Sequence, residues 1–182
     1  PLSPATRVAE EDELDDIDSS GPTLVASDPN GWMDLGLPPL AYKGEYKRNL
    51  RSGYGVSYAI FKGEARVYYM GLWKENMKDG YGTSFYWNFD FHDQRHYTGE
   101  WSLNEQSGKG RLYYEDGKVA AVGEFKNGKL HGRCKRYFRN GALSYDGRLV
   151  DGNRHGDGVS YYKSGTVEYD GSWCNGKRHG RG

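Results

Sequence analysis

Three histidines recur at a fixed interval and are the first residues whose chemistry suggests a function. His131, His155 and His179 are 24 residues apart, and Cys134 follows His131 by three positions. Imidazole and thiolate are common zinc ligands, so the spacing raises the question of a metal site. However, the chain lacks a four-ligand set at standard zinc spacing, and a repeat protein aligns equivalent residues in rows whatever their use. We therefore expect no metal, and interpret the histidines as loop residues that hydrogen-bond a neighbouring turn.

A second polar group lies in an insertion at residues 88–96. His92 and His96 lie beside Asp90 and Asp93 there, and such loop excursions often carry specificity. The same stretch supplies three further aromatic residues: Trp87, Phe89 and Phe91. Two interpretations stay open, an exposed recognition loop or a longer hairpin that covers the end of a groove.

The regularly spaced carboxylates do not resemble a catalytic pair. Glu45, Glu100 and Glu124 each follow a glycine and precede an aromatic residue. In a strand they would face away from the neighbouring rings, as solvated residues do. The sequence also contains no nucleophile elbow, P-loop or dinucleotide-binding fingerprint. We expect a protein that is not an enzyme and that uses no cofactor.

Glycine spacing shows that the chain is built from repeats. Glycine pairs nine residues apart occur six times, from Gly44 and Gly53 to Gly171 and Gly180. The first glycines of successive pairs are 27, 28, 24, 24 and 24 residues apart, which is the signature of a repeat array. We divide the chain into a tail, residues 1–41, and an array, residues 42–182. The repeats start near residues 42, 69, 97, 121, 145 and 169, and the last is incomplete.

Each repeat has the pattern of a β-hairpin. A strand of the form Tyr-x-Gly-x-Trp alternates with period two, and later repeats follow it with Asn127-Gly128, Asp151-Gly152 or Asn175-Gly176. These dipeptides favour type I′ turns, whose two central residues both have positive φ. One hairpin is unstable alone in water, whereas stacked hairpins bury their rings against one another. We predict an all-β fold: an elongated solenoid of stacked antiparallel β-hairpins with a disordered or loosely docked N-terminal tail.

The repeat unit resembles a known family. Segments 123–132 and 169–182 resemble the MORN (membrane occupation and recognition nexus) repeat, in which Tyr-x-Gly-x-Trp precedes x-Asn-Gly-x-x-His-Gly-x-Gly. The resemblance covers residues 42–182, with insertions in repeats one and two and Leu149 in place of an aromatic residue. It implies a β-hairpin array that binds partners rather than catalyses, as a scaffold or a membrane-associated module.

The resemblance also implies a groove lined by the rings of the first strands. We expect some rings to stay partly open and accept an extended partner segment, since Tyr and Trp supply apolar area with a polar tip. The alternative is that each ring simply belongs to the repeat core. The predicted groove residues are Tyr46, Tyr69, Trp73, Tyr97, Trp101, Phe125, Tyr145, Tyr169 and Trp173.

Charge is distributed unevenly along the chain. Residues 1–41 contain nine acids and one Arg, giving a net charge of −8, and the remaining residues have a net charge of +8. The basic residues that we consider for contacts with anionic lipid or an acidic partner are Lys129, Lys135, Arg136, Arg139, Arg154, Lys177 and Arg178. They are scattered through turns rather than clustered on one helix, so we expect no nucleic acid partner.

These observations favour two functional classes. The first is a non-catalytic protein–protein interaction scaffold that binds an extended partner segment or assembles in a larger complex through its aromatic face. The second is a peripheral membrane module that binds anionic lipids; an accessory fragment of a larger enzyme is a further alternative. The two cysteines do not form a disulfide framework. We therefore expect an intracellular protein, cytoplasmic or membrane-associated, with organelle import left open.

Overall fold

The computed structural model describes residues 41–61, 64–86, 94–180 and 182. Within them, twelve strands form one antiparallel sheet in which each strand pairs with its neighbours in chain order. This arrangement confirms the predicted all-β array of hairpins. The strands are β1 (Ala41–Lys47), β2 (Leu50–Phe61), β3 (Glu64–Lys74), β4 (Met77–Phe85), β5 (Arg95–Ser102), β6 (Glu105–Tyr113), β7 (Val119–Lys126), β8 (Lys129–Tyr137), β9 (Leu143–Val150), β10 (Asn153–Tyr161), β11 (Val167–Cys174) and β12 (Lys177–His179).

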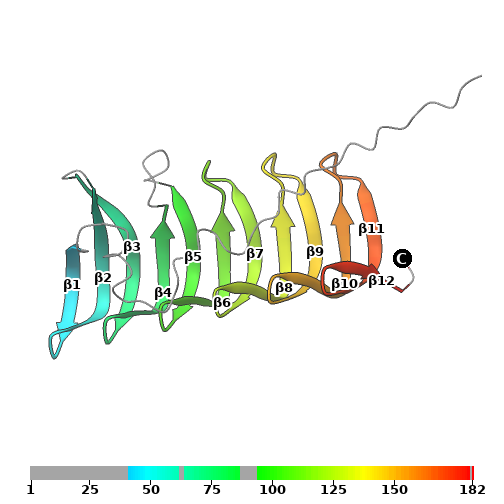
Figure 1. The fold of residues 1–182 in the computed structure, drawn as a ribbon. Helices are drawn as coiled ribbons and strands as arrows, with labels where there is room; N and C mark the ends of the chain where they lie inside the picture. Colours follow the sequence, from blue (N-terminus) through cyan, green and yellow to red (C-terminus); the bar gives the residue numbers. More distant parts are fainter. Residues whose placement is uncertain (1–40, 62–63, 87–93, 181) are drawn as a thin grey trace, which may run out of the picture.

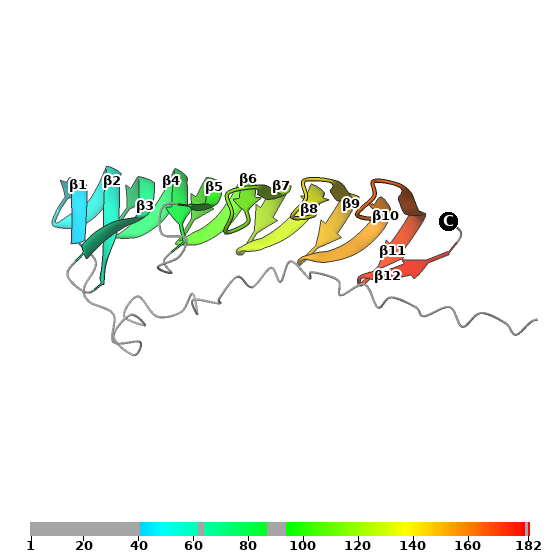
Figure 2. The same ribbon diagram turned by 90° about the horizontal axis from the view of Figure 1, so that it is seen from above.

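The array is a long single layer. Its strands stand side by side across the long axis, from β1 at one end to β12 at the other (Figure 1). Seen from above, successive hairpins follow one another, and the described strands all belong to this one sheet (Figure 2). Each repeat contributes two strands, so almost every contact is made within a repeat or with the next one. Residues 1–40 of the predicted tail and most of the 88–96 insertion lie outside the described residues, and Ala41 begins β1.

Two-residue turns close all six hairpins within the repeats. Asn127, Asp151 and Asn175 have φ of 50°, 49° and 49°, and the glycine after each also has positive φ, as type I′ turns require. The first three repeats form the same turn with a final asparagine in place of glycine: Asn49, Asn76 and Asn104, with φ of 62°, 69° and 72°. Asparagine tolerates the left-handed region better than other non-glycine residues.

These turns also join neighbouring repeats. The backbone N–H groups of Asn76, Asn104 and Gly128 each donate to a carbonyl in the preceding repeat over 3.0 Å. The Asn76 side chain adds a bond by accepting from the Arg51 N–H at 2.8 Å. Each turn therefore belongs to two repeats, which fixes the distance and angle between them.

Turns of a second kind connect later repeats at the opposite ends of the strands. Gly117, Gly141 and Gly165 have φ of 82°, 88° and 88°, and each donates its N–H to the carbonyl three residues earlier. A type I turn followed by a left-handed glycine is a common hairpin connection. Next to each such connection the register shifts by one residue, as between Leu112 and Tyr113.

This shift turns two successive side chains toward the same face of the sheet. Lys78 Nζ lies 4.5 Å from the Tyr68 ring centroid and 5.1 Å from that of Tyr69, although the two tyrosines are adjacent in sequence. We call the face that carries Tyr69, Trp73 and their counterparts the ring face. The opposite side, which carries Tyr54, Leu72 and Tyr81, is the outer face.

Candidate interaction surface

Most rings of the predicted groove are buried. Seven of the nine form the core of the array: Tyr69, Trp73, Tyr97, Trp101, Phe125, Tyr145 and Trp173, each no more than 7% exposed. Tyr169 is half-buried, and Tyr46 is 59% exposed. The seven rings therefore form the repeat core, as the alternative interpretation expects. They leave little ring surface open to a partner.

The reason is that each buried tyrosine ring of this set packs against an aromatic ring of the next repeat. The Tyr69 ring meets the Trp101 ring edge-on at 5.3 Å between centroids, and Tyr97 meets Phe125 at 4.9 Å. Edge-to-face pairs in this range are the favoured arrangement of aromatic rings. A tryptophan such as Trp101 therefore packs within its own hairpin and also covers the tyrosine ring of the preceding repeat.

Hydrogen bonds fix the orientation of these rings. The Tyr97 hydroxyl donates to the Glu100 carbonyl at 3.0 Å. The indole N–H of Trp101 donates to the Gly82 carbonyl of the preceding repeat at 3.2 Å. Glycine is needed under each tyrosine, because a Cβ at Gly110 would overlap the Tyr97 ring.

Cationic side chains cover the rings on the ring face. The Arg51 guanidinium carbon lies 4.4 Å from the Trp73 ring centroid, and that of Arg154 lies 4.5 Å from the centroid of Trp173. Lys78 Nζ is 4.8 Å from the Trp101 centroid. Cations at this distance are attracted by the ring quadrupole. Arg178 continues this row over Tyr169, while Gln106 and Leu130 occupy the same strand position in repeats three and four.

Burial changes the acidity of groups in this row. It lowers the pKa of Lys78 to about 7, with a further contribution from the positive charge of Arg51. The imidazole of His96 has a pKa lowered to about 4, again chiefly by burial and then by Lys78. His96 Nδ1 lies 3.4 Å from the Ser84 hydroxyl. At neutral pH the His96 imidazole is therefore uncharged, and Lys78 is only partly protonated.

The comparison with known families agrees with this geometry. The MORN repeat model matches six segments, residues 42–59, 69–86, 97–119, 122–143, 145–167 and 169–182. The chain belongs to the MORN repeat family. MORN repeats are generally non-catalytic and are associated with protein and membrane interactions. A search of curated proteins finds none that matches the chain.

Repeat four departs from the MORN pattern by two linked changes. Ala121 stands where other repeats have tyrosine, and Cys134 stands where they have glycine. The Cys134 sulfur fills the space of the missing ring and lies 3.6 Å from the Glu124 carbonyl, the counterpart of the carbonyl that accepts from Tyr97. Burial raises the pKa of the Cys134 thiol, so this thiol is protonated at neutral pH.

The predicted lipid-contacting residues of the MORN array do not share one surface. Arg154 and Arg178 lie on the ring face, whereas Lys135 Nζ pairs with Asp146 on the outer face at 3.0 Å. Arg136 donates to the Gly152 carbonyl. Lys129 and Lys177 follow the two-residue turns at the start of β8 and β12.

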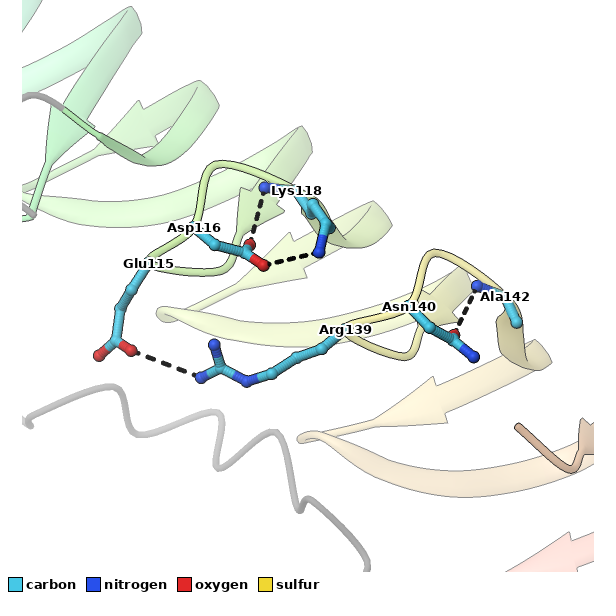
Figure 3. A network of polar contacts seen from close by, with 6 residues as sticks. All are labelled: Glu115, Asp116, Lys118, Arg139, Asn140 and Ala142. Atoms are coloured by element: carbon cyan, nitrogen blue, oxygen red, sulfur yellow. Dashed lines mark hydrogen bonds and ion pairs between the residues drawn. The ribbon is translucent and has the colours of Figure 1, made fainter. Parts of the chain in front are cut away.

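Arg139 belongs to the connecting loops at the opposite ends of the strands. It reaches back to Glu115 of the preceding repeat at 3.4 Å (Figure 3). Within the same loops, Asp116 accepts from the Lys118 N–H and Asn140 accepts from that of Ala142. Hydrogen bonds from Lys118 hold the pKa of Asp116 below its usual value. Arg139 therefore contributes to loop structure and inter-repeat contact.

The repeat histidine His131 and the repeat glutamates Glu45 and Glu100 contact neighbouring turns and strands of the array. His131 Nδ1 lies 3.4 Å from an Asp151 carboxylate oxygen at the neighbouring turn. Over the described part of the chain, no group of three or more potential ligands could hold a metal ion. Glu45 and Glu100 accept backbone N–H bonds from Tyr54 and Lys109, each at 3.0 Å, and so hold the second strand of their hairpins. Strand periodicity alone predicts only that these carboxylates face away from the rings, so it does not reveal this role.

The outer face has an exposed apolar patch near the start of the array. Tyr54, Leu72 and Tyr81 are 52%, 42% and 60% exposed, and Leu72 is the register partner of Tyr54. Later repeats have charged residues such as Lys109 and Arg133 at the tyrosine position. The sequence signal for this patch is the residue between two closely spaced glycines, which the predicted groove does not include. No helix among the described residues is long and apolar enough to cross a membrane.

Proposed function

We propose that this MORN protein is a non-catalytic interaction scaffold whose ring face binds an extended acidic segment of a partner protein. The supporting observation is the row of Arg51, Lys78, Arg154 and Arg178 over the buried rings. The core rings hold these cations in two pairs from adjacent repeats, Arg51 with Lys78 and Arg154 with Arg178. An acidic segment laid across the strands would place its carboxylates on this row, with the rings as a rigid support.

Arg51 and Lys78 give the strongest support for an acidic partner. Neither has a carboxylate within ion-pair distance among the described residues. Burial and the charge of Arg51 leave Lys78 only partly protonated at neutral pH, and a carboxylate beside it would favour the protonated form. Charge-assisted hydrogen bonds from arginine to carboxylate are stronger than neutral ones. A partner carboxylate would therefore gain a charged hydrogen bond and favour the protonated form of Lys78 at once.

The membrane alternative has weaker support. A flat anionic bilayer would have to meet many of the basic residues together, yet they lie on the ring face, the outer face and both ends of the strands. Binding of a peripheral protein to anionic lipid increases with the number of basic residues near the surface. We propose that the protein is intracellular and reaches membranes through its partner.

The test compares two charge-matched triple variants of the full chain. One removes ring-face cations, Arg51→Gln, Lys78→Gln and Arg154→Gln; the other removes outer-face cations, Lys109→Gln, Arg133→Gln and Arg148→Gln. Binding of a fluorescein-labelled polyglutamate peptide is followed by fluorescence anisotropy, and binding of phosphatidylserine vesicles by co-sedimentation. Circular dichroism verifies that both variants fold.

We expect the ring-face variant to lose about tenfold or more in peptide affinity and the outer-face variant to change by less than about threefold. Equal losses in the two variants would refute a specific ring-face site. Vesicle binding that is strong in the unaltered chain and weakened equally by both variants would support the membrane module instead.

A further inference from the structure

The net charge of the array is balanced by a short stretch of the same chain. Seven of the nine acids in residues 1–41 fall between Glu10 and Asp18. The remaining residues of the chain have a net charge of +8. Charge complementarity of this size within one molecule favours association when the connecting chain is long enough.

The cations at the β1 end of the ring face have no acidic partner among the described residues. Arg51 and Lys78 cover rings there with no carboxylate within ion-pair distance, whereas Arg178 at the other end pairs with Glu168. The charged groups of the outer face alternate in sign instead, as in the register partners Lys109 and Glu124. An acidic segment would therefore gain the most favourable electrostatic interaction on the ring face.

The connecting chain is long enough and enters the sheet at the correct end. Asp18 precedes Ala41, the first residue of β1, by 23 residues, which spans up to about 75 Å when extended. A flexible chain of that length has an end-to-end distance of roughly 27 Å. Arg51 and Lys78 lie on β2 and β4, within roughly 15 Å of β1 at about 4.8 Å per strand.

We propose that the acidic segment Glu10–Asp18 binds in cis to the Arg51–Lys78 end of the ring face. The inference rests on the proposed function, because it makes this segment a competitor of an acidic partner at the same cations. The effective concentration of a tethered segment is in the millimolar range, so weak ion pairs are enough to occupy the site. An external acidic partner must then displace the segment before it binds.

Indole N–H signals provide a direct test on the full chain. Trp73 lies under Arg51 and Trp101 under Lys78, whereas Trp173 lies at the far end of the array. A nitroxide label is attached to the variant Ser19→Cys in a Cys174→Ser background, where the remaining Cys134 is buried. Paramagnetic broadening is then read from the three indole signals.

We expect the Trp73 and Trp101 indole signals to lose more than half their intensity at low salt while that of Trp173 is retained. The lost signals should return at about 0.5 M salt, which screens ion pairs at the surface. They should also return when the seven acids of residues 10–18 are changed to Asn or Gln. Equal broadening of all three signals, or of none, would overturn the proposal.

The polyglutamate peptide separates this inference from the proposed function. In the seven-acid variant we expect peptide affinity to rise about tenfold, and Arg51→Gln with Lys78→Gln to cancel the rise; the matched control is Arg133→Gln with Arg148→Gln. If the rise is absent but the cation variants still weaken binding, the cis contact is wrong and the binding face stands. If the cation variants have no effect in either background, the proposed function itself fails.

Discussion

The paired change in repeat four can be reversed to test how the core is packed. Ala121 and Cys134 replace the tyrosine and glycine of other repeats, and the Cys134 sulfur takes the place of a hydroxyl that bonds to a carbonyl. In repeat three the same position is filled by Tyr97, which is fully buried. We predict that Ala121→Tyr and Cys134→Gly are each destabilising alone and compatible together.

The expected magnitudes follow from the space available. Cys134→Gly leaves a cavity and adds backbone freedom, for a loss of about 2 kcal/mol in the free energy of unfolding. Ala121→Tyr forces a ring into the volume of the Cys134 sulfur, a contact already close enough that Gly123 could not carry a Cβ; overpacking of this kind costs about 1–3 kcal/mol. Together they should rebuild the arrangement of repeat three, within about 1 kcal/mol of the unaltered chain.

Urea unfolding followed by circular dichroism measures the four free energies of this cycle. We expect a favourable coupling of at least about 2 kcal/mol between the two sites, at or above the upper end of the range for residues in contact. The control pairs Ala121→Tyr with Cys174→Gly, a change at an exposed cysteine two repeats away, which should give no rescue. Additive losses in the Ala121/Cys134 pair would refute the idea that sulfur and ring occupy the same space.

Three further predictions concern single residues. Trp101→Phe removes the indole bond to the Gly82 carbonyl and should lower the free energy of unfolding by about 1–2 kcal/mol in urea titration. Asn104→Gly keeps the φ of 72° but loses the bond that Asn104 Oδ1 accepts from the Lys78 N–H at 2.8 Å, and should cost about 1 kcal/mol. Asn104→Ala loses the same bond and adds left-handed strain, and should cost about 1–2 kcal/mol more by the same assay. Because burial lowers the pKa of Lys78 to about 7 from an unfolded value near 10.5, the unfolded chain binds more protons between these values. Stability should therefore rise from about pH 7 to pH 9, and Lys78→Met should flatten this rise.

The hairpin array could be predicted because its signals are local and repeated. Asn127-Gly128 and its later counterparts identify type I′ turns directly, and the observed positive φ values confirm them. The turns of the first three repeats follow the same geometry without glycine, as at Leu103-Asn104. Their signal was the asparagine at the second turn position, which only the alignment of all six repeats makes visible.

The state of the rings could not be predicted from one repeat. Period two correctly places Tyr69 and Trp73 on one face, yet it does not show that Trp101 of the following repeat packs against Tyr69. The bulge that turns Tyr68 toward the same face also breaks the period. The burial of a ring depends on the aromatic residue of the neighbouring repeat and on the cation that covers it. The residue pattern within one strand shows neither contact.

The packing chemistry of the array changes at repeat four. Between repeats three and four the stack still has two rings, Tyr97 and Phe125, but between four and five Leu130 and Leu149 fill the core. Neither Phe125 nor Leu149 has an indole N–H to donate to the preceding repeat, unlike Trp173, which bonds the Gly158 carbonyl at 2.9 Å. Because a solenoid is held by a sum of neighbour interfaces, local opening should begin at repeat four. The row of ring-face cations is interrupted in repeats three and four, where Gln106 and Leu130 stand at the cation position, so this change of packing separates the two cationic ends of the ring face.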